Sequence, residues 1–204
     1  MGYDHFIFKL IFVLCSYLIG CLTIGYYLVK AIKGQDIRFL DTGSTGARNV
    51  GRQLGVFGFL VTFLWDFAKG YFIIAAARYF SIDPIIKIFA MNAVVIGHIW
   101  PVQLGFKGGK GFSTASGLLF AMNAPFFLIL LLPLTLFFCF LQNLIVSGML
   151  TALFAPVLGF FLIQSRTEII GIAFLSFFIL SAHRSDIKDL IRSLSYESVR
   201  NTHI

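Results

Sequence analysis

Long apolar runs, separated by short polar segments, dominate the pattern of the chain. The runs extend over Leu10 to Val29, Val56 to Ala77, about Ile85 to Ile99, and Phe112 to Ala182. A helix needs about 20 predominantly apolar residues to cross a bilayer. The pattern therefore predicts an all-α integral membrane protein.

The last run sets the number of crossings. It can hold two long helices or four short ones, and it is interrupted at Asn123 to Pro125, Gln142 to Asn143 and Gln164 to Glu168. These three breaks favour four helices, the first of them a short one near Phe112 to Met122. We therefore expect about seven transmembrane helices, with five as the alternative.

Basic residues predict which side each polar segment faces. Twelve of the sixteen lysines and arginines fall at Lys30 to Lys69, Lys107 to Lys110 and Arg184 to Arg200. Loops rich in lysine and arginine face the cytoplasm. All three segments are therefore expected on that side, and an odd number of crossings puts the N-terminus outside and the C-terminus in the cytoplasm.

Composition agrees with a membrane protein. The chain of 204 residues is 58% hydrophobic and 12% charged, whereas soluble domains are about 25% charged. We expect one domain, residues 1–204. The net charge of +7 reflects basic loops and not nucleic-acid binding. The cysteines (Cys15, Cys21 and Cys139) lie in apolar runs without zinc spacing, so we interpret them as small apolar residues.

The C-terminal segment has the spacing of an amphipathic helix. Its apolar positions are Ile187, Leu190, Ile191 and Leu194, and its basic positions are Arg184, Lys188 and Arg192. Such a helix lies on the membrane surface. The pattern fits a simple anchor as well as a functional element.

One polar loop between the apolar runs is rich in glycine and lysine. Lys107, Gly108, Gly109, Lys110 and Gly111 follow one another. Glycine lets backbone N–H groups turn toward a ligand, and two ammonium groups beside them would favour an anion such as phosphate. The spacing is not that of a Walker A loop. A plain basic cytoplasmic loop is the alternative interpretation.

An earlier polar segment, Asp41 to Arg52, is also rich in hydrogen-bond donors. Its candidate binding residues are Thr42, Gly43, Ser44, Gly46, Arg48, Asn49 and Arg52. The planar guanidinium of arginine suits phosphate oxygens. The alternative is a flexible loop. Two such segments on one side of the membrane suggest a site that brings two phosphate-bearing groups together.

Two histidines and one charged pair complete the candidates. His98 and His183 each lie where an apolar run meets a polar segment, and either could act as a base or be an ordinary interfacial residue. Asp66 and Lys69 lie inside an apolar run, where charged residues are often functional. They are about one helical turn apart, so they could also simply pair.

The segments Thr42 to Arg52, Gly97 to Gly111 and His183-Arg184 occur in the order of a known family. Together with Asp66 to Gly70, they resemble the bacterial PlsY-type acyl-phosphate:glycerol-3-phosphate acyltransferases over nearly the whole chain. Departures from the family pattern fall at Asp41, Thr42, Ser44, Arg48 and Asp186. They leave open a different phosphorylated acceptor.

The resemblance implies seven helices, an inner-membrane location, a site facing the cytoplasm, and no cofactor or metal. It implies transfer of a fatty acyl group from acyl phosphate to the 1-hydroxyl of glycerol 3-phosphate, which yields lysophosphatidic acid and phosphate. Lys110, His183 and His98 are the candidate catalytic residues. Lys107, Lys110 and the amides of Gly108 and Gly109 would bind anions, with Asp186 beside them.

Two further expectations remain. A transporter or flippase of a phosphorylated lipid, or a non-catalytic scaffold, would also show basic loops, so these are the alternative functions. Arg48 and Asp186 replace Thr and Asn of the family pattern. If their segments meet, they could compensate by forming an ion pair. Neither the acyl-chain preference nor the oligomeric state is predicted.

Overall fold

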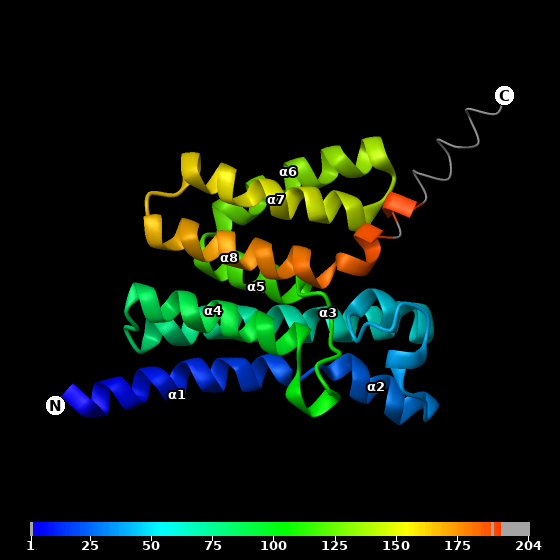
Figure 1. Ribbon diagram of the computed structural model, residues 1–204, viewed down its shortest axis with the longest axis horizontal. Coiled ribbons are helices and arrows are strands. Elements are labelled where there is room, and N and C mark those ends of the chain that lie inside the picture. The colour runs from blue at the N-terminus through cyan, green and yellow to red at the C-terminus, as the bar shows by residue number, and fades with distance from the viewer. Residues whose placement is uncertain (1, 189, 193–204) are drawn as a thin grey trace.

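The computed structural model describes residues 2–188 and 190–192, and its long elements are all helices (Figure 1). The helices are α1 (Gly2–Cys21), α2 (Ile24–Lys33), α3 (Ala47–Tyr79), α4 (Pro84–Ile99), α5 (Phe112–Met122), α6 (Ala124–Leu141), α7 (Leu144–Leu162) and α8 (Arg166–Ala182). Two short 3₁₀ turns, η1 (Ile37–Phe39) and η2 (Val102–Leu104), lie in the connections. The all-α membrane fold predicted from the pattern is confirmed.

Polar breaks in the last apolar run are helix N-caps. The Asn123 side chain accepts from the Phe126 amide at the start of α6, and Asn143 does the same for α7. Ser165 caps α8. These side chains satisfy amides that have no partner inside the helix. The run therefore holds four helices, as its breaks predict.

Helix α3 contains a kink that separates its polar start from its apolar body. Gly55 has a φ of 69° and a ψ of −162°, which only glycine adopts readily. The residues before it carry Arg48, Asn49 and Arg52, whereas Val56 begins the apolar run. The donor-rich segment is therefore partly helical, and its arginines lie on the first turns of α3.

Five spans are long and apolar enough to cross a membrane among the described residues. Helix α8 becomes a sixth when it is joined to the segment Arg184–Arg192, which is bent from it by 61°. The 11-residue α5 reaches only about 16 Å, short of the roughly 30 Å of a bilayer core. Seven crossings therefore stay a prediction. Leu194, expected on the apolar face of the tail, lies outside the described residues.

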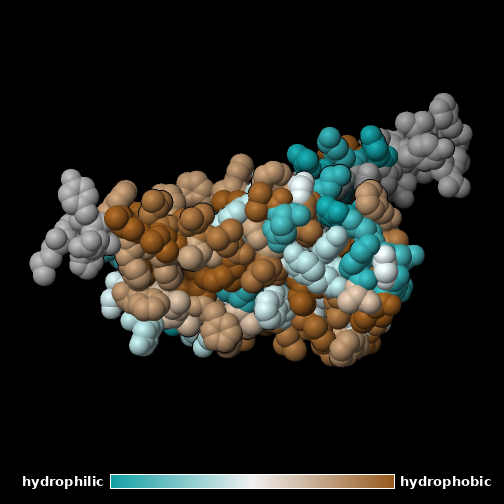
Figure 2. All heavy atoms as spheres, turned by 90° about the horizontal axis from the view of Figure 1, so that it is seen from below, coloured by the Kyte–Doolittle hydropathy of each residue, from teal (hydrophilic) through white to brown (hydrophobic). Residues whose placement is uncertain are grey.

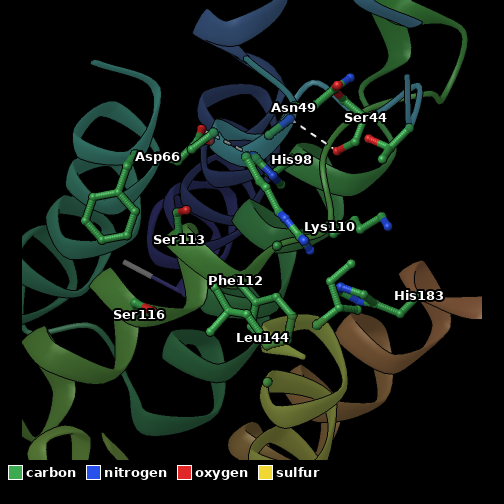
Figure 3. A pocket seen from close by; sticks show the side chains of 18 of the residues that line it. Ser44, Asn49, Asp66, His98, Lys110, Phe112, Ser113, Ser116, Leu144 and His183 are labelled. Carbon is green, nitrogen blue, oxygen red and sulfur yellow. Dashed lines mark hydrogen bonds and ion pairs between the residues drawn. The ribbon is translucent and has the colours of Figure 1, made fainter. Parts of the chain in front are cut away.

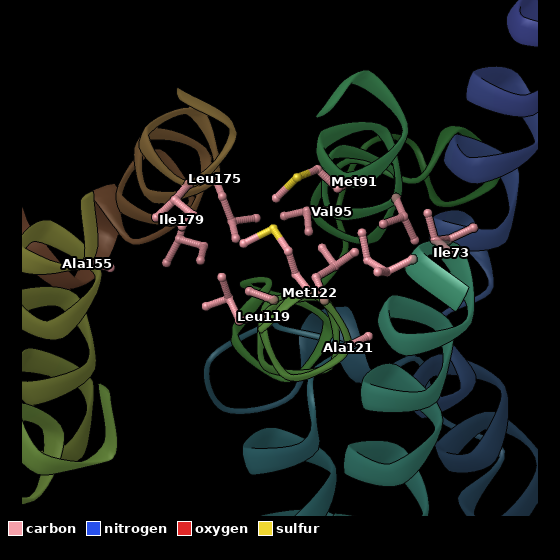
Figure 4. Packing of buried hydrophobic residues seen from close by; sticks show 14 of the residues in the cluster. Ile73, Met91, Val95, Leu119, Ala121, Met122, Ala155, Leu175 and Ile179 are labelled. Carbon is pink, nitrogen blue, oxygen red and sulfur yellow. The ribbon is translucent and has the colours of Figure 1, made fainter. Parts of the chain in front are cut away.

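Apolar side chains cover much of the outer surface, and hydrophilic ones gather toward one end (Figure 2). Inside, a cluster joins α3, α4, α5 and α8 (Figure 4). Small residues bring α3 and α5 together, because a Cβ on Gly117 would lie 1.9 Å from the Phe67 carbonyl oxygen. Such close approach is typical of membrane helices, and it holds the start of α5 against α3.

Candidate active site

A cavity of about 310 Å³ lies where α3 and α5 begin and where α4 and α8 end (Figure 3). Polar residues line part of it: Thr42, Ser44, Gly46, Arg48, Asn49, Asp66, His98, Lys110, Ser113, Ser116 and His183. Apolar side chains line the rest, among them Phe59, Phe63, Phe112, Leu134, Leu144 and Ile145. The cavity therefore joins a polar region to an apolar one.

Two helix N-termini open into this cavity. Gly46 is the N-cap of α3 and Gly111 is the N-cap of α5, and neither can donate or accept through a side chain. The first amides of a helix have no partner inside it. They carry partial positive charge and favour anions. Two anionic groups could therefore bind close together here.

Lys110 immediately precedes α5 and supplies the main positive charge of the cavity lining on that side. Its ammonium lies 2.7 Å and 2.5 Å from the two carboxylate oxygens of Asp186. The side chains are 22% and 21% exposed. The expected pairing of Asp186 with Arg48 is therefore wrong: Asp186 binds Lys110, and Arg48 lines the cavity with an exposed side chain.

His183 follows the last residue of α8 and is 2% exposed. Its Nδ1 lies 2.8 Å from the carbonyl oxygen of Ile179, to which it donates as the neutral tautomer. Burial lowers the pKa of the His183 imidazole below its ordinary value of 6.5, and the Lys110 ammonium adds to the lowering. Its Nε2 is then an unprotonated acceptor near neutral pH.

His98 belongs to a buried charged cluster between α3 and α4. Lys69 contacts His98 Nδ1 at 2.9 Å and Asp66 Oδ1 at 2.9 Å, and it donates to the Gly20 carbonyl. The expected Asp66–Lys69 pairing is confirmed. On the other edge of the ring, a Cβ at Gly109 would lie 2.0 Å from Nε2. His98 thus packs directly beneath the glycine-lysine loop.

The amides of Gly108 and Gly109 do not face the cavity. Gly108 N donates to the Ile99 carbonyl and Gly109 N to the His98 carbonyl, each at 3.0 Å. The expectation that these two amides bind an anion is therefore corrected. They tie the loop to the end of α4.

The first polar segment is held against the glycine-lysine loop. Thr45 N donates to the Gly108 carbonyl at 3.2 Å, and Asn49 Nδ2 donates to the carbonyls of Leu40 and Ser44. Arg38 adds a further link through a 2.7 Å hydrogen bond to Leu104. Both side-chain donors of Asn49 are therefore used within the first polar segment. Its buried Oδ1 has no partner among the described residues and can accept a hydrogen bond from a ligand.

The structure brings most of the predicted site residues to one cavity. Those that line it are Thr42, Ser44, Gly46, Arg48, Asn49, His98, Lys110 and His183. The predicted site residues that do not line it are Gly43, Arg52, Lys107, Gly108, Gly109 and Asp186. Arg52 instead pairs with Asp41 at 2.6 Å, and Lys107 is exposed.

Sequence reasoning missed several residues of the lining. Ser113 and Ser116 lie on the cavity side of α5, and Phe112 lies between them and His183 (Figure 3). A three-residue spacing after the glycine-lysine loop would have placed both serines on one helix face. The apolar residues of α6 and α7 had no comparable signature in the sequence.

Comparisons with known proteins agree with this arrangement. A family model described as glycerol-3-phosphate acyltransferase matches residues 10–193. Glycerol-3-phosphate acyltransferase 1 of Desulfitobacterium hafniense is 37% identical over 193 residues, which cover 91% of this chain and 92% of the relative. A relative from Aquifex aeolicus is 45% identical over 116 residues, 56% of this chain and 59% of its own length.

Two crystal structures share the fold. PlsY (YgiH), an integral membrane glycerol 3-phosphate acyltransferase in its glycerol 3-phosphate form, superposes with a TM-score of 0.83 and 31% identity. The lysophosphatidic acid form of PlsY (YgiH) gives a TM-score of 0.80 and 29% identity. Each match spans 91% of this chain and 92% of the chain in the crystal structure.

Proposed function

Because this chain belongs to the glycerol-3-phosphate acyltransferase family and acylates glycerol 3-phosphate in phospholipid synthesis, we propose that its acyl donor is acyl phosphate. The acceptor atom is the 1-hydroxyl of glycerol 3-phosphate, and the products are lysophosphatidic acid and phosphate. The observation that carries this proposal is the pair of helix N-termini that open into one cavity with an apolar side.

The donor phosphate belongs at Lys110 and the start of α5. An acyl phosphate is a mixed anhydride, so its carbonyl carbon is already activated. The Lys110 ammonium and the first amides of α5 stabilise the negative charge that develops on the leaving phosphate. The apolar side of the cavity accepts the start of the acyl chain.

The acceptor phosphate belongs at the start of α3. Arg48 supplies positive charge, and so do the first amides of α3, because the N-cap residue Gly46 has no side chain to accept from them. Thr42 and Ser44 add hydroxyl groups. The unpartnered Oδ1 of Asn49 accepts from a hydroxyl of the glycerol. Both anions are then held in one orientation, which removes much of the entropic barrier to reaction.

In the reaction, the 1-hydroxyl oxygen attacks the acyl carbonyl carbon. A carbon–oxygen bond to glycerol forms, and the carbon–oxygen bond to phosphate breaks with its electron pair leaving on phosphate. The attacking hydroxyl donates its one hydrogen bond to His183 Nε2, which orients it. As the new bond forms, the proton passes by way of this nitrogen to an oxygen of a substrate phosphate.

His98 takes a positioning role in this scheme. Its Nδ1 is occupied by Lys69, and its carbonyl accepts from Gly109. The ring therefore supports the loop that ends in Lys110. It stays the alternative base, because it also lines the cavity.

We place the site at the cytoplasmic face of the bacterial inner membrane, in one domain of seven crossings. The segments whose lysines and arginines predict a cytoplasmic location are the same segments that meet at the cavity. Single cysteines at Ser44, Ser113 and Ser185, in a background without native cysteines, should react with impermeant maleimide only after permeabilisation. Labelling of any one in intact cells would contradict this orientation.

The activity test uses purified protein, palmitoyl phosphate and labelled glycerol 3-phosphate, with extraction of lysophosphatidic acid. Lys110→Ala should lower kcat/KM at least about a hundredfold, the usual cost of removing one transition-state donor. Lys188→Ala removes an exposed lysine away from the cavity and is the matched control. Equal or faster turnover with palmitoyl-CoA would overturn the choice of donor.

A further inference from the structure

A second cavity of about 100 Å³ lies in the apolar interior beside the first. Phe112, Ser116, Leu134 and Gly148 line both cavities, so the two adjoin at these residues. We call the second cavity the apolar chamber. Its lining comes from α5, α6, α7 and α8.

Lining residues of the apolar chamber suit a hydrocarbon. Apart from Ser116, Thr151 and Ser176, the described residues that line it are apolar. The Thr151 hydroxyl donates to the Ser147 carbonyl of its own helix at 2.8 Å, so it does not need a ligand. Figure 4 shows Leu119, Ala155 and Ile179 facing this part of the interior from three helices.

The four shared residues surround the junction between the two cavities, and the Phe112 ring closes it on the side of α7. A Cβ on Gly148 would lie 2.8 Å from Cζ of Phe112, with further ring atoms at 3.2 Å and 3.3 Å. The same ring also meets the His183 imidazole, with centroids 4.9 Å apart in an edge-to-face arrangement. The ring therefore keeps its place only because residue 148 has no side chain.

We propose that the apolar chamber receives the far end of the donor acyl chain and that Phe112 and Gly148 form the neck that sets chain length. The inference rests on the proposed function, since the acyl carbonyl must lie near Lys110 and His183. A chain that leaves that position toward the apolar side meets the Phe112 ring. A short chain ends before the neck, and a long chain passes it into the chamber.

Burial of each methylene changes affinity about fourfold. Narrowing the neck should therefore penalise long chains progressively and leave short chains almost unaffected. Selectivity then depends on residue 148, which neither contacts a phosphate nor carries a reacting group.

The experiment compares octanoyl, dodecanoyl and hexadecanoyl phosphate as donors for the wild type and two glycine variants. In Gly148→Ala the added Cβ displaces the Phe112 ring away from α7, toward the part of the neck that Ser116 and Leu134 line. Gly159→Ala is the matched control in the same helix, because its Cβ would make only ordinary contacts of 3.7–3.8 Å. We expect Gly148→Ala to lower the hexadecanoyl-to-octanoyl ratio of kcat/KM about tenfold or more. Gly159→Ala should leave this ratio unchanged.

Ala155→Leu, which fills the chamber below the neck, provides a second variant if Gly148→Ala fails to fold. It should produce the same loss for long donors. Equal chain-length profiles in the wild type and in whichever of these variants folds would overturn the inference.

A binding readout separates this inference from the proposed reaction. Hexadecyl and octyl phosphate cannot transfer an acyl group, yet they carry the same head and tail. Hexadecyl phosphate should raise the Tm of the wild type more than octyl phosphate does. This difference in Tm between the two ligands should be smaller in Gly148→Ala and unchanged in Gly159→Ala. Absence of lysophosphatidic acid overturns the reaction, whereas an unchanged difference in Tm overturns the chamber.

Discussion

Replacement of Asp186 by asparagine should increase the affinity of the site for phosphate. In the structure the Asp186 carboxylate contacts the Lys110 ammonium through both oxygens. An incoming phosphate must share that ammonium with a carboxylate of like charge. Asparagine keeps the shape and one acceptor but removes the competing charge, and it restores the residue of the family pattern.

The geometry sets the size of the effect. The side chains of Lys110 and Asp186 are about four-fifths shielded, with 22% and 21% exposure. Exposed pairs contribute about 0–1 kcal/mol, and breaking a fully buried pair costs about 3–5 kcal/mol. A value of about 1–2 kcal/mol lies between these limits, and it corresponds to a change of about fivefold to thirtyfold in a binding constant.

The assay is product inhibition by inorganic phosphate, which is soluble and occupies the place of the leaving group. The inhibition constant against acyl phosphate should fall about fivefold to thirtyfold in Asp186→Asn. Glu168→Gln is the control, because Glu168 pairs with Lys87 at 2.8 Å with similar shielding, near the opposite end of α8. Glu168→Gln should lower Tm about as much as Asp186→Asn does, because each removes one shielded ion pair, but it should leave the inhibition constant unchanged.

Two results would refute the reasoning. An unchanged or higher inhibition constant in Asp186→Asn would show that the carboxylate does not compete with phosphate. An equal change in Glu168→Gln would show that loss of a shielded ion pair acts through the whole fold and not at Lys110.

Three more outcomes are expected. Because burial lowers the pKa of His183 and the neutral ring is the competent form, wild-type kcat/KM should fall as pH drops through a value below 6.5. The ratio of His183→Asn to wild type should rise through the same pH range, since substrate titration is common to both and cancels; a ratio that stays flat would remove His183 as the titrating group. Gly109→Ala should lower kcat/KM at least about tenfold because its Cβ would lie 2.0 Å from His98 Nε2, and unaltered kinetics would remove His98 as a support of the loop. Asn49→Ala removes two hydrogen bonds, worth about 1 kcal/mol each, so Tm should fall and the KM for glycerol 3-phosphate should rise; a lower Tm with unchanged KM would limit Asn49 to holding the loop.

Helix positions follow from the sequence because they depend on local properties. A run of apolar residues is stable in a bilayer only when its backbone groups bond within the segment, as in a helix. Asn123, Asn143 and Ser165 interrupt the runs and cap the next helices. The number of membrane crossings does not follow from the same local pattern, because α5 is a short helix packed against α3.

The sequence alone also identified the chemistry of the site. Glycines, lysines, arginines and hydroxyls are concentrated in two segments, and their charge puts both on one side of the membrane. That information is enough to predict a phosphate-binding site that includes Lys110, Arg48 and Asn49, and the resemblance to the family added His183.

Only the tertiary structure decided which groups are available to a ligand. Asp186 binds Lys110 and not Arg48, and the Gly108 and Gly109 amides are used by carbonyls at the end of α4. The contact of Phe112 with Gly148 joins two helices far apart in the sequence. Each depends on distances of a few ångströms between segments, which helix packing sets and which a linear pattern of residue types does not contain.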